Sequence, residues 1–556
     1  MTLVVDEVRS THLSPPATFV VLPTAESAPE RSAEQETAPE LRGSRRWAWA
    51  VLVAATAAAV TASIWAHVTG HVGLLGDEAS HLLHARRVFD SATPGLGQIG
   101  QYWPPLYQIL ELPFVWIDPL YRSGWAGSIA GGIGYVGGVM GAYVLGTEVT
   151  RDRRSGVIAA IAFGANPSML YLQSTAMMES AIAMGLVWSA AGLVRFWRTG
   201  RYRDVVLAGL GASLACWTHY GAWAMPLYGA VVVAIGCRRR GFGWRKTETY
   251  AVSYAIAAAY ASVLWMMWNF YLQHNPVSFV QSSPPAPEVL SETFVNGRPG
   301  SVAYAATVYG LAVWHVLGPV LTVAVVGTLL VSLLRRRFFH PLGAALAATG
   351  FAVTLITLKG GSIGSPTFAR WTGLTITHAY NDNIRYALWT APFAAAAVAV
   401  IAGRSRLRQV ATLFAVLAGL VWFLPGLGGT PAIDDPDTTS SLVIDRVVGA
   451  QLADTYDGGR VLLSSRNGGD RLIWHSGEDA SQFITEFNGP LYAAAVALPR
   501  AHVRYVLITP RSSLEGRLSP SELERAGYSP VWTFDAYANG DLLYTLYERD
   551  RTLTGA

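Results

Sequence analysis

Long apolar runs recur along this chain from Trp47 to Leu424. A run of roughly 20 apolar residues is long enough to cross a bilayer as a helix. The composition agrees, because 51% of the 556 residues are hydrophobic and only 14% are charged. The sequence therefore predicts a polytopic α-helical membrane protein, not a soluble or a disordered chain.

The apolar runs divide into about eleven predicted spans of bilayer length. They cover residues 47–68, 125–149, 155–173, 179–197, 204–219, 221–236, 248–270, 303–334, 341–358, 385–403 and 409–424. A further apolar stretch, residues 104–120, begins with two prolines and carries Glu111 and Asp118. We expect it to lie at the outer membrane interface as an amphipathic helix.

Arginine and lysine cluster in the short loops between the runs, and such clusters stay on the cytosolic side of a membrane. They are Arg42, Arg45 and Arg46; Arg151, Arg153 and Arg154; Arg195, Arg198, Arg201 and Arg203; Arg238, Arg239, Arg240, Arg245 and Lys246; Arg335, Arg336 and Arg337; and Arg404, Arg406 and Arg408. If residues 104–120 crossed the membrane, the Arg151 cluster would lie outside. We therefore expect that this stretch does not cross. The first cluster predicts a cytosolic N-terminus. Because the predicted number of spans is odd, everything after Pro425 is predicted to be extracytoplasmic.

Three regions differ in composition. Residues 1–42 are polar and poor in large apolar residues, which predicts a disordered cytosolic tail. Residues 43–428 form the predicted membrane domain, with long outer loops that carry Trp, Tyr, Pro and acids. In residues 429–556, strand-like runs at 460–464, 503–509 and 542–547 alternate with helical patterns, which predicts a small extracytoplasmic α/β domain.

The charge and cysteine content exclude two classes of function. A net charge of +4, with its arginines in short loops, gives no support to nucleic-acid binding. The two cysteines, Cys216 and Cys237, lie in or beside apolar runs and form neither a disulfide framework nor a Cys-x-x-Cys metal motif.

A pair of adjacent acids, Asp77 and Glu78, lies a few residues beyond the first apolar run. Placing carboxylates at the end of a membrane helix costs free energy, so these two acids are candidates for a functional site. The alternative is structural, with Asp77 as a helix cap and Glu78 as a solvated acid of the first turn. His81 and His84 follow on nearly the same helical face as Asp77. That spacing suits a divalent cation, but lone interfacial histidines are commoner than ligands, so no metal ligand is assigned and the need for a divalent cation stays open.

Several further motifs follow the acid pair along the chain. The acid pair in Gly76-Asp77-Glu78 opens a helix, and Trp103-Pro104-Pro105-Leu106-Tyr107 follows as an interface helix. A polar cluster ends at Glu179, and Arg385-Tyr386 precedes an apolar helix with proline. The order of these motifs resembles that of GT-C fold glycosyltransferases. It is most similar to the polyprenyl-phosphate-sugar users, which include protein O-mannosyltransferases and the aminoarabinose transferases that modify lipid A. The resemblance covers residues 47–424.

This resemblance implies a membrane enzyme that moves a hexose or pentose from a polyprenyl-phosphate donor to a glycan, lipid or protein acceptor outside the cell membrane, in cell-envelope assembly. Asp77 is the expected base, because the reaction removes a proton from an acceptor hydroxyl. Arg385 is the expected phosphate ligand, because guanidinium binds phosphate oxygens bidentately. The full set of expected residues is Asp77, Glu78 and Glu179 for catalysis, Arg385, Lys359 and His219 for the donor phosphate, and His81, Tyr107 and Tyr386 for the substrate cavity.

Two alternatives remain open from the sequence. A transporter or flippase of lipid-linked sugars would usually show two similar halves with broken helices near the midplane, and the chain shows no such repeat. A GT-C-like binding protein without catalysis is the second alternative. It is kept open because Thr218-His219-Tyr220-Gly221 lacks the lysine that the related families often carry in this turn.

Overall fold

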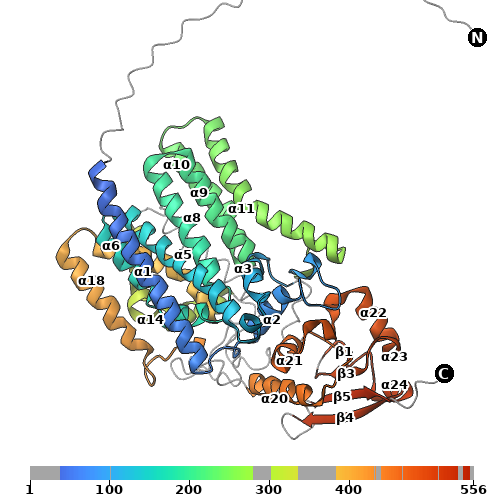
Figure 1. The fold of residues 1–556 in the computed structure, drawn as a ribbon. Helices are drawn as coiled ribbons and strands as arrows, with labels where there is room; N and C mark the ends of the chain where they lie inside the picture. Colours follow the sequence, from blue (N-terminus) through green and yellow to red (C-terminus); the bar gives the residue numbers. More distant parts are fainter. Residues whose placement is uncertain are drawn as a thin grey trace, which may run out of the picture. The chain divides into compact units, whose positions relative to one another are not determined.

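The computed structural model describes residues 38–100, 102–279, 302–335, 384–430, 432–433, 440–465, 468–510, 512–535 and 543–550. Contacts divide the chain into two units, Met1–Arg46 and Trp47–Ala556. Within the second unit, long helices form one part and a small five-stranded sheet with short helices forms the other (Figure 1).

Long apolar helices account for most of the described residues before Leu424. They are α1 (Ala38–Val68), α5 (Trp125–Thr150), α8 (Glu179–Thr199), α9 (Tyr202–Thr218), α10 (Met225–Arg239), α11 (Trp244–Gln273), α14 (Val302–Leu334), α17 (Ala391–Ala402) and α18 (Arg406–Gly419). With the 3₁₀ turns that extend some of them, 8 helices among the described residues are long and apolar enough to cross a membrane, or up to 9 if one bent pair counts as a span. α9, which corresponds to the predicted span 204–219, has 17 residues and is not one of these 8. The protein is a multi-pass helical membrane protein. The predicted span 341–358 lies outside the described residues, so the total of eleven stays a prediction.

Two predicted spans are broken in the structure. Residues 155–173 form α6 (Arg153–Gly164) and α7 (Pro167–Gln173), bent by 67°. The break follows from Asn166-Pro167, because proline cannot continue the hydrogen bonds of α6 and Asn166 caps α7 by accepting from the Met169 backbone nitrogen at 3.0 Å. In α14 the break is at Gly318, whose φ of 75° is not helical.

The apolar stretch at residues 104–120 forms two short helices, α3 (Leu106–Val115) and α4 (Asp118–Arg122). The 10 residues of α3 span about 15 Å, which is too short to cross a bilayer. This length agrees with the prediction that the stretch does not cross. α2 (Gly76–Arg86) precedes it and packs against α3.

The sheet has the strand order β2-β1-β3-β5-β4. β1 (Val461–Leu463) pairs in parallel with β2 (Phe483–Ile484) and β3 (Tyr505–Ile508), whereas β5 (Leu543–Arg549) pairs antiparallel with β3 and with β4 (Tyr528–Asp535). The helices of this part are α20 (Ser440–Thr455), α21 (Gly469–Ser476), α22 (Pro490–Ala497), α23 (Pro499–His502) and α24 (Pro520–Arg525). The structure confirms an α/β fold and the three strand runs predicted from the sequence, and adds β2 and β4.

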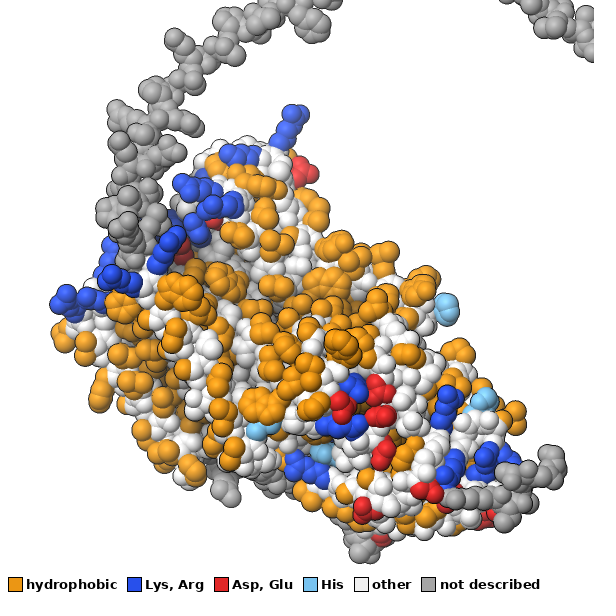
Figure 2. All heavy atoms as spheres, viewed as in Figure 1, with side chains coloured by type: hydrophobic (Ala, Val, Ile, Leu, Met, Phe, Trp, Pro, Cys, Tyr) orange, Lys and Arg blue, Asp and Glu red, His pale blue; other side chains and the backbone are white. Residues whose placement is uncertain are grey.

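One hydrophobic core lies among the long helices, and a second is shared by α2 and the sheet. Leu82 and Leu83 of α2 belong to the same buried cluster as Val461, Leu463 and Ile473. Hydrophobic side chains cover much of the visible face of the helical part, whereas charged side chains lie mainly at its ends (Figure 2). The shared core holds α2 against the C-terminal part.

Candidate active site

Three charged residues chosen from the sequence meet in the structure. Arg385 Nε donates to Glu179 Oε1 at 2.7 Å, and Arg385 Nη2 forms an ion pair with the Asp77 carboxylate. The side chain of Glu179 is 2% exposed and that of Arg385 is 9% exposed, whereas Asp77 is 36% exposed. The arrangement is a buried guanidinium between one buried carboxylate and one carboxylate that faces solvent.

Each of the three lies where a helix begins. Asp77 is in the first turn of α2, Glu179 is the first residue of α8, and Arg385 lies in the 3₁₀ helix η3 (Ile384–Thr390) that precedes α17. The N-terminus of a helix carries a partial positive charge, which stabilises the two carboxylates there. Local helix starts and the packing of α2, α8 and η3 therefore determine this cluster.

Glu78 has a different environment from Asp77. It has no exposed surface, and its Oε2 accepts from the Gly73 backbone nitrogen at 2.7 Å. Burial raises the pKa of Glu78 to about 7, although backbone N–H groups, including that of Gly73, act in the opposite direction. Glu78 therefore faces the protein interior and holds the loop that leads to Asp77.

His81 and Tyr107, both predicted to line a substrate cavity, have no exposed surface in the structure. The His81 ring lies 4.4 Å from that of Trp103 and 5.5 Å from that of Tyr107, between ring centroids. Neither His81 nitrogen has a hydrogen-bond partner among the described residues, and burial lowers its pKa to about 3, so the ring is neutral. The Tyr107 hydroxyl is within 3.2 Å of the Gly127 carbonyl oxygen, to which it donates. Both side chains form an interior wall.

His219 and Tyr386 lie beside Arg385. The Arg385 guanidinium carbon is 5.5 Å from the centre of the Tyr386 ring, and the Tyr386 ring is 5.2 Å from that of His219. His219 Nδ1 accepts from the Gly221 backbone nitrogen at 2.9 Å, which assigns the ring proton to Nε2. Two of the residues predicted to bind phosphate are therefore in one neighbourhood. The third, Lys359, lies outside the described residues.

In the described part of the chain, no group of three or more His, Cys, Asp or Glu side chains is arranged to hold a metal ion. His84, which shares a helix with His81, is paired with an acid instead, because its Nε2 is 3.2 Å from Asp470 Oδ2. Between Asp77 and Glu179, the positive charge is supplied by Arg385.

Sequence reasoning missed two groups of buried polar residues. Asp470, which binds Arg87 as well as His84, comes from the C-terminal part, where no motif marked it. Glu111 and Gln108 of α3 are buried, and none of their side-chain polar atoms has a partner among the described residues. Burial raises the pKa of Glu111 well above its usual value. A charged residue in an apolar stretch was the signal available for Glu111.

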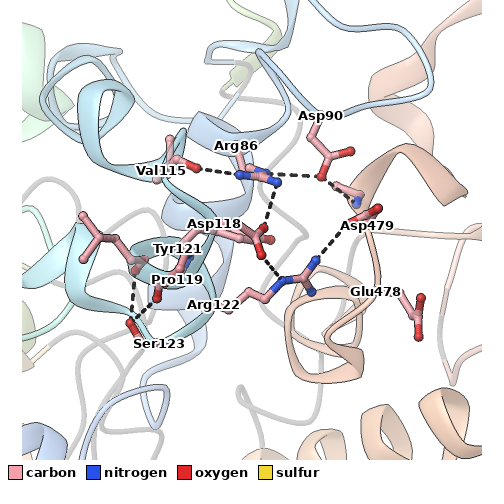
Figure 3. A network of polar contacts seen from close by, with 12 residues as sticks. Arg86, Asp90, Val115, Asp118, Pro119, Tyr121, Arg122, Ser123, Glu478 and Asp479 are labelled. Carbon is pink, nitrogen blue, oxygen red and sulfur yellow. Dashed lines mark hydrogen bonds and ion pairs between the residues drawn. The ribbon is translucent and has the colours of Figure 1, made fainter.

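A more exposed ion-pair network joins α2, α4 and the C-terminal part (Figure 3). Arg86 binds Asp118 at 2.9 Å and Asp90 at 3.2 Å. Arg122 binds Asp118 at 2.7 Å and Asp479 at 2.7 Å. Partly exposed pairs contribute little individually, so this network links the elements without adding much to their stability.

No protein-family model matches the sequence, and no curated protein matches it. Solved structures with partial similarity include ArnT from Cupriavidus metallidurans bound to undecaprenyl phosphate, at 15% identity and a TM-score of 0.47, covering 91% of this chain and 99% of that chain. They also include the Archaeoglobus fulgidus oligosaccharyltransferase in complex with Zn and sulfate, at 14% identity and a TM-score of 0.45, covering 87% of this chain and 72% of that chain. Archaeoglobus fulgidus AglB, in complex with an inhibitory peptide and a dolichol-phosphate, has 13% identity and a TM-score of 0.44. This similarity covers 92% of this chain and 75% of that chain.

Proposed function

We propose that this chain is a GT-C type membrane glycosyltransferase that moves a hexose or pentose from a polyprenyl-phosphate donor to an acceptor outside the cell membrane. The observation that supports it is the meeting of Asp77, Glu179 and Arg385, which lie far apart in the sequence. The cluster joins a solvent-facing carboxylate with a guanidinium, the groups needed to accept a proton and to bind a phosphate. In this proposal the N-terminus is cytosolic and the C-terminal α/β part is extracytoplasmic.

Asp77 serves as the base in this proposal. Its side chain is 36% exposed, so an acceptor hydroxyl has access to the carboxylate. Asp77 takes the hydroxyl proton while the acceptor oxygen forms its bond to the anomeric carbon of the sugar. The bond between that carbon and the phosphate oxygen breaks, and polyprenyl phosphate leaves with the bonding electrons.

Arg385 binds the donor phosphate and stabilises the charge that develops on it. In the structure Arg385 holds Asp77, so the phosphate competes with Asp77 for the guanidinium. Donor binding therefore frees the carboxylate when the sugar is in place. Glu179, almost fully buried, keeps its bond to Arg385 Nε and fixes the plane of the guanidinium, which makes it a positioning residue.

His219 and the interior wall complete the proposed site. The Nε2–H of His219 is a second donor for the phosphate, in the turn where the related families often carry lysine. Lys359 stays a candidate for the same role. His81 of α2 packs against Tyr107 of α3, and Tyr386 forms a side of the site next to Arg385.

The test uses purified protein and a panel of polyprenyl-phosphate hexoses and pentoses, each with glycan, lipid and peptide acceptors. We expect release of polyprenyl phosphate from at least one donor. Asp77→Asn keeps the side-chain volume but removes the base, so turnover should fall by roughly two to four decades. The matched control is Glu248→Gln, which removes an exposed acid of α11 and should leave turnover unchanged. A folded wild-type protein that releases polyprenyl phosphate from no donor contradicts the proposal.

A further inference from the structure

The end of α2 opposite Asp77 is tied to the C-terminal part by a buried ion cluster. Asp470 of α21 makes two contacts there. Its Oδ1 is 2.9 Å from Arg87 Nη2, and its Oδ2 is 3.2 Å from His84 Nε2. The Asp470 and Arg87 side chains are each 4% exposed, and the His84 side chain is 0% exposed. A carboxylate from one part of the fold is thus buried against His84 of α2 and against Arg87, the C-cap residue of that helix.

Further contacts enclose the same cluster. The Arg87 guanidinium carbon lies 4.3 Å from the centre of the Phe487 ring, and the His84 ring centroid lies 4.5 Å from the same ring. Burial acts to raise the pKa of Asp470, but Arg87 and His84 outweigh this effect and lower it. The carboxylate is therefore ionised at neutral pH. Breaking one side of a buried charge pair is strongly unfavourable, because the other charge stays buried without compensation.

The C-terminal part also covers the loop that leads into α2. Arg446 Nη2 of α20 donates to the Val72 carbonyl oxygen at 3.0 Å. Trp474 of α21 packs so closely on Gly73 that a Cβ there would lie 2.5 Å from the indole ring. In Figure 1, α2 lies beside α21, and the two helices are in contact. Both ends of α2 are therefore held by α20, α21 and their neighbours.

We propose that Asp470 is a positioning residue, which anchors α2 to the C-terminal part and thereby keeps Asp77 in place beside Arg385. A helix of 11 residues moves as a rigid rod, so a displacement at His84 and Arg87 is transmitted to Asp77 at its other end. The catalytic consequence rests on the proposed function, whereas the anchoring itself does not.

The test of the anchor measures the access of a thiol reagent to two buried positions in the full chain, with Cys216 and Cys237 replaced by alanine. Ala85→Cys probes the core that α2 shares with the sheet, and Ala495→Cys probes a core cluster within the C-terminal part. Both alanines are 0% exposed. In the Asp470→Asn background, we expect the labelling rate at position 85 to rise by about tenfold or more through local opening, while position 495 stays protected.

Two further variants separate the anchor from general destabilisation. Arg87→Gln removes the partner of Asp470 and should give the same labelling pattern. The Asp470→Asn/Arg87→Gln pair carries no uncompensated charge from either residue and should recover part of the protection at position 85. Glu548→Gln, which breaks the pair with Arg504 elsewhere in the C-terminal part, is the matched control and should change neither probe.

The activity measurement uses any donor that the wild-type protein turns over. Asp470→Asn should lower kcat by about a hundredfold, the effect of a misplacement of roughly 1 Å, with the KM for the donor little changed. Unchanged labelling at position 85, or equal increases at positions 85 and 495, would overturn the anchor. A normal kcat in a protein whose position 85 has become accessible would overturn the positioning role. If the wild-type protein uses no donor, the proposed function fails, and the labelling still decides the anchor.

Discussion

At the scale of single residues, Asp77 and Glu78 are neighbours with opposite environments. Consecutive positions on a helix point about 100° apart, so one of the two faces solvent while the other faces the protein. Asp77 reaches Arg385, whereas Glu78 is buried and bonded to the Gly73 backbone. The acid pair that stands out in the sequence therefore divides into a reactive candidate and a structural one.

The raised pKa of Glu78 predicts a pH dependence of stability. Below pH 4.5 the carboxyl is neutral in both the folded and the unfolded state, so no stability is lost. Between pH 4.5 and about 7 the carboxyl ionises only in the unfolded state, so the free energy of unfolding decreases as the pH rises. The total decrease is about 3 kcal/mol. Above this range the free energy of unfolding no longer changes with the ionisation of Glu78. Glu78→Gln keeps an oxygen for the Gly73 N–H but cannot ionise. The Tm of the wild type should therefore fall by a few degrees more than that of Glu78→Gln between pH 4.5 and 8.

Thermal unfolding in detergent at the two pH values is the measurement. Glu248→Gln, which removes an exposed acid, should keep the pH dependence of the wild type. An unchanged pH dependence in Glu78→Gln would show that the Glu78 carboxyl is not held neutral by burial.

The bond between Arg385 and Glu179 changes how the phosphate role of Arg385 must be tested. Arg385→Ala alone leaves the buried Glu179 carboxylate without its partner, which costs about 3–5 kcal/mol of stability. The Arg385→Ala/Glu179→Gln pair removes both charges and should recover most of that stability. Donor use should still be weakened in the pair, by about 1.5–3 kcal/mol for a lost charged hydrogen-bond partner.

The measurements are the Tm and kcat/KM for the donor. Arg385→Lys keeps the charge but loses the planar guanidinium that can bind two phosphate oxygens. It should therefore weaken donor use less than Arg385→Ala/Glu179→Gln does. Acceptor affinity should change little in each variant. A stable Arg385→Ala/Glu179→Gln protein with unaltered donor use would leave Arg385 as a structural partner of the two acids, and the phosphate site would have to be sought near His219 or Lys359.

At the scale of elements, the short length of α3 fixes which stretches of the first loop can cross the membrane. Because α3 is too short, α1 and α5 are successive crossing helices, and their intervening loop begins and ends on one side. The positive residues that follow α5, Arg151, Arg153 and Arg154, then lie on the opposite side from that loop.

Thiol labelling in intact cells tests this topology, with Cys216 and Cys237 replaced. Ser155 is unsuitable as a probe, because it is 0% exposed and its hydroxyl donates to the Gly403 carbonyl oxygen. Ser123 and Arg154 are exposed and are the better positions. Ser123→Cys should react with an impermeant reagent from outside, whereas Arg154→Cys should react only after the cells are opened. Labelling of Arg154→Cys in intact cells would reverse the proposed orientation.

At the scale of the whole molecule, α2, α4 and the sheet share one hydrophobic core. Leu83 of α2 and Tyr121 of α4 are buried in the same cluster as Leu463 of β1. Because the cluster is continuous, the loop between α1 and α5 and the C-terminal part are expected to lose their structure together.

Leu463→Ala tests this coupling. A buried leucine replaced by alanine costs about 2–5 kcal/mol, and Leu463 is 0% exposed. Limited proteolysis with mass spectrometry should show new cuts in residues 70–124 as well as in residues after 440. Leu207→Ala, at a position 48% exposed on α9, should add no cuts in either region. Cuts confined to residues after 440 would mean that the two regions open independently.

The membrane class, the positions of most of the described spans and the strands β1, β3 and β5 could be predicted from the sequence alone. Apolar runs and alternating patterns are properties of consecutive residues, so they can be recognised without knowledge of the fold. The same local signals identified Asp77 as an acid at a helix start. Asn166-Pro167 and Gly318-Pro319 lie inside two of the predicted spans, but whether such a run bends depends on the helices that pack around it.

The partners of these residues, in contrast, follow from the fold and not from the sequence pattern. Arg385 was expected to bind a phosphate, and the fold places it between Asp77 and Glu179, which come from two other helices. Asp470 carried no signal at all, because its importance comes from Arg87 and His84, more than 380 positions earlier in the chain. Ion pairs between distant segments depend on which helix faces pack together and on how completely water is excluded there, and neither quantity is encoded in a local pattern of residues.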